Sequence, residues 1–253
     1  MTISAEPSAT LSHLYRADGS ATFSQNGYTV IGAVNGPIEV QRRDELPEEA
    51  AVDVIVRPAA GVGGTRERHL ESILQSTIRQ IILIHNFPRT LIQITLQITS
   101  TPENDSASSK LVQASSNLPI LPTLLQTTVL TLLSASIPLA MTLASISFAI
   151  NSTGSSRKII RNPTLEEFQA ANSVHVLAFT SNGQLLVAES EGSFTLEVWD
   201  EVYEIGKDFC CDVTEPAGDD IMQQDGLDGN TGGMAFVRST LEHKVSADLH
   251  WKD

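Results

Sequence analysis

The segment from Leu118 to Ser136 carries no charged residue, and its apolar side chains recur around the whole circumference of a helix. A helix of this kind has no polar face to turn toward water, so we expect it to lie buried inside the fold. Pro138 marks its end, because proline removes a backbone donor and clashes with the preceding turn. The rest of the chain must therefore supply the elements that cover this helix.

The flanking segments predict both strands and helices. Asn26-Gly27 and Asn182-Gly183 each interrupt an alternating apolar and polar pattern, and both positions of such two-residue turns tolerate positive φ, so each pair indicates a hairpin. Thr65 is the expected N-cap of the first helix. This order predicts an α+β fold with mixed sheets. We expect strands over 20–25, 28–34, 51–59, 91–99, 145–150, 158–161, 173–180 and 184–188, and further helices over 65–85, 164–171, 195–205 and 234–251.

By composition the chain divides into four parts. Residues 1–18 are rich in Ser, Thr and Ala and are expected to form a flexible leader, whereas residues 19–211 hold the periodic segments of one folded domain. Residues 212–233 are rich in Gly and Asp, which predicts an acidic flexible linker. Residues 234–253 return to helical periodicity and predict a C-terminal helix.

The net charge of −14 argues against binding to nucleic acid when the chain is taken as a whole. The charge is unevenly distributed, however. Residues 57–102 hold five arginines and two acidic residues, whereas residues 207–233 hold one lysine and seven acidic residues. Part of the acidity lies in the expected linker and part of the basicity in the folded domain, and we therefore predict that RNA contacts, if made, belong to the folded domain.

No segment has the ~20 consecutive apolar residues that a membrane helix needs, and the N-terminus lacks a signal-peptide pattern. The adjacent Cys210 and Cys211 fit a reducing compartment, so the chain is expected to be soluble and intracellular, with no membrane contact. The six histidines show no spacing with cysteines or carboxylates that favours zinc. We predict neither a metal nor a cofactor.

The most distinctive local string is Gly61-Val-Gly-Gly-Thr-Arg66, which precedes the first expected helix. Glycine amides at a helix N-terminus can hold a phosphate, with Arg66 and Arg68 as charge partners. Alternatively, the glycines only permit a turn from strand to helix. The string lacks the Lys-Ser/Thr end of a P-loop and the spacing of a dinucleotide fingerprint.

Other candidate residues carry weaker signals. Arg42, Arg43 and Arg89 could contact an RNA backbone, although isolated arginines are usually solvated surface groups. His175 is expected to be a core or edge residue, because no nucleophile or base accompanies it in the sequence. Adjacent carboxylates such as Glu166 and Glu167 point apart on a helix, so a paired acid/base role is not expected for them.

Five short motifs are distinctive in combination: Gly36-Pro-Ile-Glu39, Glu45-Leu-Pro47, Ile55-Val-Arg-Pro-Ala59 with Gly61, Thr65-Arg-Glu67, and Phe87-Pro-Arg-Thr90. Together they resemble the RNase PH family, and within it the subunits of the eukaryotic exosome ring. The resemblance covers roughly residues 11–210 and implies the ribosomal S5 domain 2-like architecture with mixed sheets and packed helices.

Active members of this family cleave RNA by phosphorolysis, and they carry a Gly-Gly-Thr-Arg loop immediately before the second long helix. Here that position reads Asn117-Leu-Pro-Ile-Leu-Pro-Thr-Leu-Leu125, and the Gly63-Gly-Thr-Arg66 string precedes the first helix instead. The family's catalytic aspartates are also missing, because no aspartate lies between Asp105 and Asp200 and the first expected acid falls at or near Asn162. The resemblance therefore implies a chain without catalytic residues, in which Arg66 matches a phosphate-contacting position.

The resemblance therefore implies a structural subunit whose partners are other RNase PH-like ring subunits, S1/KH-type cap subunits and non-specifically bound RNA. It also implies a location in nucleus, nucleolus and cytoplasm. The expected RNA-contacting residues are Arg66 and Arg89, followed by Arg42, Arg43 and Arg68. One alternative is an active phosphate-dependent 3′-exoribonuclease that uses Arg66, Arg89 and Glu166 or Glu167. A second alternative is a free-standing α+β domain of another role.

Overall fold

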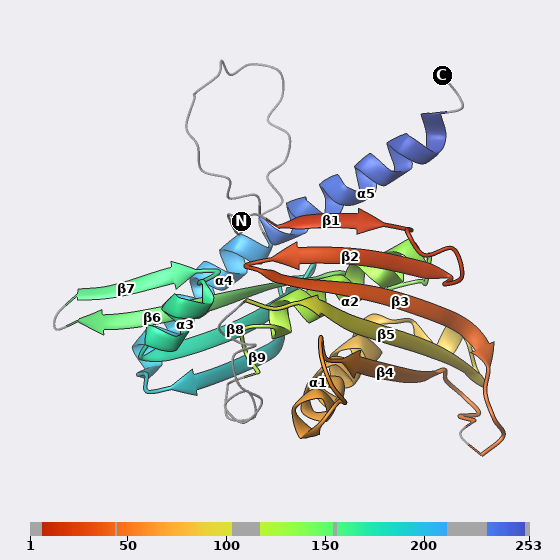
Figure 1. Ribbon diagram of the computed structural model, residues 1–253, viewed down its shortest axis with the longest axis horizontal. Helices are drawn as coiled ribbons and strands as arrows, with labels where there is room; N and C mark the ends of the chain where they lie inside the picture. Colours follow the sequence, from red (N-terminus) through yellow and green to blue (C-terminus); the bar gives the residue numbers. More distant parts are fainter. Residues whose placement is uncertain (1–6, 44, 103–116, 154–155, 212–231, 251–253) are drawn as a thin grey trace.

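The computed structural model of the protein describes residues 7–43, 45–102, 117–153, 156–211 and 232–250 (Figure 1). Two sheets hold its strands. The first has five strands in the order β1-β2-β3-β5-β4, in which β4 runs parallel to β5 and the other neighbours are antiparallel. These strands are β1 (Ser8–Leu11), β2 (Gly19–Gln25), β3 (Tyr28–Glu39), β4 (Ala51–Arg57) and β5 (Thr90–Ser100).

The second sheet is antiparallel throughout, with the order β7-β6-β8-β9. The predicted two-residue turn at Asn26-Gly27 joins β2 to β3, and both residues adopt positive φ. The predicted hairpin of β8 and β9 is also present, but its loop has three residues, because the Thr180 N–H donates to the Gln184 carbonyl; of Ser181, Asn182 and Gly183, only Gly183 adopts positive φ. The strands of this sheet are β6 (Leu143–Thr153), β7 (Ser156–Arg161), β8 (Ser173–Thr180) and β9 (Leu185–Gly192). The α+β fold with mixed sheets is confirmed.

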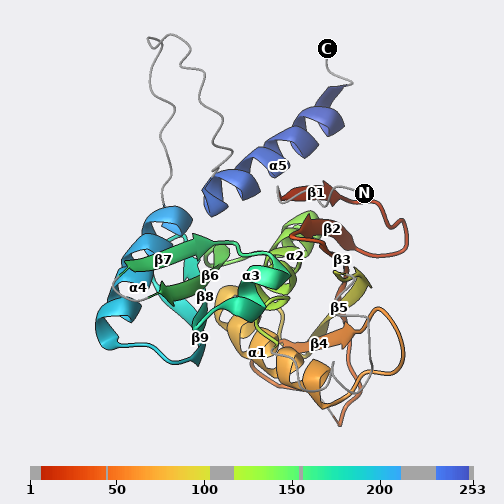
Figure 2. The same ribbon diagram turned by 60° about the vertical axis from the view of Figure 1, so that its left-hand side comes forward.

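The helices lie in layers around the two sheets. Figures 1 and 2 show α2 between the sheets, α1 beside β4, and α5 close to β1. Helix α2 contacts both β2 and β3 of one sheet and β6 of the other, while α4 packs on β6 and β8. The helices are α1 (Thr65–Ile81), α2 (Leu121–Ser134), α3 (Leu165–Ala170), α4 (Leu196–Cys211) and α5 (Gly233–Leu249), with a short 3-10 helix over Ile84–Asn86.

The expected burial of the apolar helix is confirmed, because every residue of α2 from Leu121 to Leu132 is buried. Its buried threonines bond to the helix itself. Thr127 Oγ1 donates to the Thr123 carbonyl at 2.6 Å, and Thr128 Oγ1 donates to the Leu124 carbonyl at 2.7 Å. A buried hydroxyl without a partner would destabilise the fold, so these local bonds are what make so many threonines compatible with a central helix.

One hydrophobic core joins the two sheets through α2. It runs from Val30 and Ile94 of the first sheet through Leu124 to Val174 and Val176 on the inner face of β8. A second core lies on the outer face of the four-stranded sheet beneath α4 and the start of α5. The two cores are separate because successive side chains of β8 point to opposite faces of its sheet.

In several places the structure differs from the sequence expectations. The first helix, expected over 65–85, ends at Ile81, because Ile82 turns to extended backbone and bridges Leu139. Ser8–Leu11, in the expected leader, forms β1 and pairs with β2, so this part belongs to the sheet. Thr65 is not the N-cap of α1; Gly64 takes that position, and its N–H donates to Glu67 Oε2 at 2.6 Å. The Glu67 carboxylate thus accepts from the N–H of the N-cap residue itself, which is the reverse of the bond expected of a threonine hydroxyl at the N-cap. Almost all of the predicted linker, 212–231, lies outside the described residues.

Candidate functional site

The predicted RNA-contacting arginines fall into two groups at opposite ends of the five-stranded sheet. Arg42, Arg43 and Arg89 lie near the end where Ala51 pairs with Leu91, whereas Arg66 follows the end where Arg57 pairs with Gln97. Six residue steps along β4 separate the two pairs, which corresponds to about 20 Å at the usual rise of a strand. The arginines therefore do not converge on one site.

At the first end, Arg89 is the best defined of the three. Its side chain is 68% exposed, and its Nε lies 3.3 Å from Glu45 Oε1. A surface ion pair of this kind adds little stability and leaves most of the guanidinium facing water. Arg42 and Arg43 are exposed in the turn that follows β3. Their neighbour Asp44 lies outside the described residues.

At the other end, Arg66 connects the beginnings of two helices. It is half-buried in the first turn of α1, and its Nε donates to Asn117 Oδ1 at 2.7 Å, four residues before α2 begins. Arg68, two residues further along the same helix, is exposed. The arginine that matches a phosphate-contacting position is thus bonded to the segment in which the resemblance expects the missing phosphate loop.

The glycine string before α1 fits the turn interpretation. Gly61 has φ 83°, which favours glycine, and a Cβ added there would meet nothing within 4 Å, so the requirement is conformational and not steric. The Gly64 N–H, which a phosphate would need, donates to the carboxylate of Glu67. The chain's own anion therefore occupies the start of the helix.

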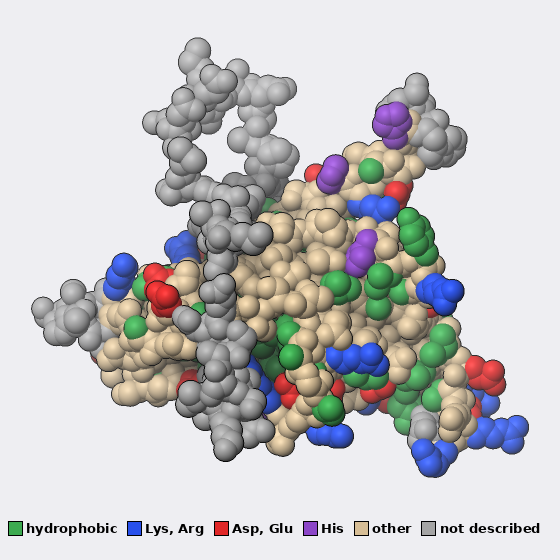
Figure 3. Space-filling model, viewed as in Figure 1, with side chains coloured by type: hydrophobic (Ala, Val, Ile, Leu, Met, Phe, Trp, Pro, Cys, Tyr) green, Lys and Arg blue, Asp and Glu red, His purple; other side chains and the backbone are tan. Residues whose placement is uncertain are grey.

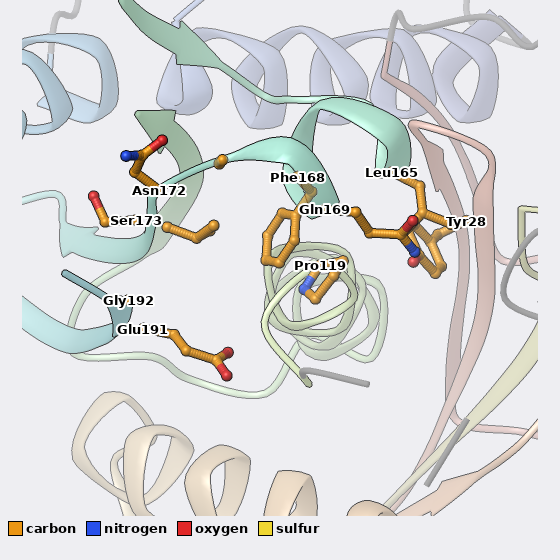
Figure 4. Close-up of a pocket in the computed structure, with 11 residues that line it drawn as sticks. Tyr28, Pro119, Leu165, Phe168, Gln169, Asn172, Ser173, Glu191 and Gly192 are labelled. Atoms are coloured by element: carbon orange, nitrogen blue, oxygen red, sulfur yellow. The ribbon is translucent and has the colours of Figure 1, made fainter. Parts of the chain in front are cut away.

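A cavity of about 370 Å³ lies beside the segment that leads into α2 (Figure 4). In Figure 4, Phe168 of α3 and the carboxylate of Glu191 at the end of β9 reach toward Pro119 from different sides. The walls are mostly apolar, with amide and hydroxyl groups at the margin. The lining residues are Tyr28, Pro119, Leu165, Phe168, Gln169, Ala171, Asn172, Ser173, Val174, Glu191 and Gly192.

The charge of this cavity is opposite to that of a phosphate site. Glu191 is the charged residue among those that line it, and the lining includes neither lysine nor arginine. An inorganic phosphate dianion and the 3′ end of an RNA would both be repelled by the carboxylate, with no cation to hold them. Among the described residues, the cavity therefore offers apolar contact and one negative charge.

Comparisons with known proteins agree with this architecture. Residues 6–154, more than half of the chain, match the RNase PH family, described as the 3′ exoribonuclease family, domain 1. This chain belongs to the RNase PH family. It is a homologue of the exosome complex component RRP46 of Saccharomyces cerevisiae, with 36% identity over 203 residues that cover 78% of this chain and 86% of the yeast protein.

Solved structures show the same RNase PH fold. The crystal structure of rice (Oryza sativa) Rrp46 matches with a TM-score of 0.66 and 26% identity, covering 79% of this chain and 86% of the rice chain. The Archaeoglobus fulgidus exosome with RNA bound to the active site matches with a TM-score of 0.59 over 80% of this chain and 84% of that chain. At 13% identity the archaeal similarity concerns the fold alone.

In this RNase PH chain, the acidic residues that could replace the missing aspartates are placed elsewhere. Glu167 accepts hydrogen bonds from Thr164 N at 2.9 Å and Thr164 Oγ1 at 3.1 Å, so its carboxylate caps α3. Glu166 is exposed, and neither glutamate lines the cavity. Asn162, at the expected position of the first acid, has φ 46° and accepts a hydrogen bond from Asn26 Nδ2 on its backbone carbonyl.

His175 is a core residue, as expected. Its side chain is buried, and its Nδ1 lies 2.8 Å from Ser190 Oγ. Its ring packs against Phe194 in a T-shaped arrangement, with 4.6 Å between the ring centroids. Burial lowers the pKa of His175 below its ordinary value of 6.5 because the charged form is poorly solvated there. The ring is therefore a neutral packing group.

The two cysteines are free thiols, and burial raises the pKa of Cys210 to about 12. Within the described ranges, no group of three or more His, Cys, Asp or Glu side chains is placed to hold a metal ion. None of the described helices is both long and apolar enough to cross a membrane.

Of the cavity residues, the sequence indicated the segment around Pro119 and missed the others. Tyr28, Phe168 and Glu191 come from β3, α3 and β9, far apart in the chain. Each has an ordinary local pattern for a strand or a helix, so no local signal marks them as neighbours.

Proposed function

We propose that this chain is a non-catalytic structural subunit of the RNA exosome core ring. In this role it supports 3′-to-5′ RNA processing and degradation, including rRNA maturation and mRNA turnover, in nucleus, nucleolus and cytoplasm. Its partners are other RNase PH-like ring subunits, S1/KH-type cap subunits and RNA. The similarity to yeast RRP46 across 86% of that protein, an exosome complex component by name, supports the assignment to this complex.

The cavity beside α2 is the observation that carries the non-catalytic part of the proposal. Phosphorolysis requires an inorganic phosphate held next to an anionic RNA end, with positive groups that stabilise the negative charge of the transition state. The cavity offers Glu191 and apolar walls, and Arg66 is turned to Asn117. Glu167, which could act as a substitute acid, is bonded to Thr164. These contacts favour a chain that lends structure to the ring over an active 3′-exoribonuclease.

RNA contact in this proposal is made by the folded domain through backbone phosphates. Arg42, Arg43, Arg68 and Arg89 are exposed, and Arg66 is half-buried at the start of α1. Figure 3 shows Lys and Arg side chains along the lower edge of the molecule, separated from one another by other surface. Contacts between such side chains and phosphates carry no sequence information and weaken steeply as salt increases.

An activity assay tests the catalytic part. The purified full chain is mixed with inorganic phosphate and a single-stranded RNA, and nucleoside diphosphates are measured by chromatography. We expect no release above a no-protein control. Phosphate-dependent release that disappears in Arg66→Ala or Glu166→Ala would show the active exoribonuclease instead.

Assembly is tested separately by the size of the protein in extract. A ring subunit should elute far above its own 27.3 kDa, together with several other chains of related fold. Elution as a monomer in mild salt would contradict the assignment to the ring, whatever the activity assay shows.

The two arginine groups can be separated by single charge reversals in the assembled complex. Arg66→Glu tests one end of the sheet and Arg89→Glu tests the other, with Arg238→Glu on α5 as a control of equal charge change. We expect crosslinking of RNA to this subunit to fall in the first two variants and to persist in the control. Equal loss in all three would indicate a general effect of charge and not contact at these sites.

A further inference from the structure

Strand β9 forms one edge of the four-stranded sheet, and that edge lies beside the cavity. Within the described ranges, β8 pairs with β9 on one side and no strand pairs with it on the other. An edge strand presents unpaired N–H and C=O groups that can accept an additional strand. Because Glu191 and Gly192 at its end also line the cavity, a strand added at this edge would run past the cavity's mouth.

Two acidic side chains of β9 share the face on which the cavity lies. Glu189 is paired with Val176 and Glu191 with Val174 in the register of β8 and β9, and both valines belong to the core that faces α2. Directly opposed residues of an antiparallel pair point to the same face, so Glu189 and Glu191 both lie on the face of the sheet that holds the cavity, and Glu191 lines the cavity itself.

We propose that this edge is a docking site for an extended segment of a partner protein. The segment adds a strand to β9, places lysines or arginines at alternate positions beside Glu189 and Glu191, and inserts an apolar side chain between Phe168 and Pro119. Main-chain hydrogen bonds supply affinity in this mode of recognition, and pockets for alternate side chains supply specificity.

Charge and shape together favour this occupant. RNA is disfavoured because two carboxylates face it and the cavity lining contains no cation. A second copy of this edge is disfavoured because it would oppose like charges across the new strand pair. The volume of about 370 Å³ is at the lower end of ligand pockets, about 300–1,000 Å³, which suits one or two inserted side chains.

Selection from a random octapeptide library on the immobilised full chain tests the proposal. We expect enriched peptides to carry Lys or Arg at positions i and i+2 and an aromatic residue, Leu or Met at i−2 or i+4, because only alternate positions of a strand share a face. Glu189→Lys with Glu191→Lys should weaken binding of a synthetic enriched peptide about tenfold, measured by fluorescence anisotropy, since two attractive cross-strand pairs become repulsive. Peptides with Asp or Glu at the same two positions should then bind this double variant.

Three controls make the result specific to this edge. Glu201→Lys with Glu204→Lys, an equal charge change on exposed positions of α4, should leave binding unchanged. Gln169→Trp, which fills the cavity from α3, should weaken peptides that carry the apolar residue. Two N-methylated peptides complete the controls, one methylated at the odd-numbered amides and one at the even-numbered amides. Only one of the two should lose binding, because only one set of amides faces β9.

Several outcomes would overturn the proposal. These are selection of no common motif, equal weakening by the α4 control, unchanged binding of both N-methylated peptides, or displacement of the peptide by a short single-stranded RNA. The last result would show that RNA, and not a protein segment, occupies this surface.

Discussion

The beginnings of α1 and α2 make an instructive contrast. Helix α1 carries the Gly63-Gly-Thr-Arg66 string that the family's active members place before the second helix, yet its first amide is bonded to the chain's own Glu67. Helix α2 begins with apolar residues and a proline in its first turn and is buried on every side. The start of α1 has the string but pairs its N-cap amide with a carboxylate, and the start of α2 lacks the string and is apolar, so neither helix start offers free amides of this string to an anion.

The two helices also depend on different forces. Helix α1 packs on β4 with one face and leaves Arg68 and Ser76 exposed, so its stability combines packing with local contacts at its ends. Helix α2 has almost no surface, and its stability comes from burial between the two sheets. The difference can be tested by substitutions matched between the helices.

The largest expected effect is on the buried helix. Leu124→Ala removes a side chain that is 0% exposed, and we expect it to lower the free energy of unfolding by about 2–5 kcal/mol. Ser76→Ala on the exposed face of α1 should change it by less than about 0.5 kcal/mol. Chemical denaturation of both variants measures the difference. Similar losses in the two variants would show that α2 is less tightly packed than its burial implies.

A smaller effect is expected at the start of α1. Glu67→Ala removes the carboxylate that accepts from Gly64 N, and the loss of a cap costs about 1 kcal/mol. Arg68→Ala, one residue later and exposed, is the matched control and should cost less. Denaturation midpoints at low and high salt give the comparison. If Glu67→Ala leaves stability unchanged, the first amide of α1 does not depend on this carboxylate and the loop is freer to bind an anion than we argue.

His175 in β8 predicts that the free energy of unfolding depends on pH, whereas α2 carries no titratable side chain and contributes no such dependence. Because the folded pKa of His175 lies below its unfolded value of 6.5, the unfolded chain binds a proton first as pH falls, and stability is lost below about pH 6.5. The free energy of unfolding should fall less between pH 7 and pH 5 in His175→Gln. His243→Gln, at an exposed position of α5, is the control. A slope unchanged by His175→Gln would show that this ring is not kept neutral by burial.

The smallest expected effect on stability comes from removing a threonine hydroxyl, and we expect it to be equal in α1 and α2. Thr77 in α1 donates to the Ile73 carbonyl and Thr128 in α2 donates to the Leu124 carbonyl, each within its own helix. Because the bond is local in both, Thr77→Val and Thr128→Val should each change stability by no more than about 1 kcal/mol. A much larger loss for Thr128→Val in thermal unfolding would reveal a partner for this hydroxyl beyond its own helix.

The sequence by itself determined the features that rest on local periodicity and turn chemistry. The buried helix, the turns at Asn26-Gly27 and Asn182-Gly183, and the absence of the glycine loop before Leu121 all follow from short stretches of residues. The N-cap of α1 was expected at Thr65 but is Gly64, and the residue that accepts a hydrogen bond there is Glu67, three positions further along the chain. The family, too, could be recognised from short motifs, because they are contiguous.

Only the tertiary structure decided how distant residues are brought together or kept apart. It separated Arg66 from Arg89 by the length of β4, although both lie in one locally basic segment. It brought Tyr28, Phe168 and Glu191 around one cavity and left the edge of β9 open beside them. The physical reason is that sheet register and layer packing arise from contacts between residues far apart in the chain, and a hydrophobic pattern states which face is buried but not what it is buried against.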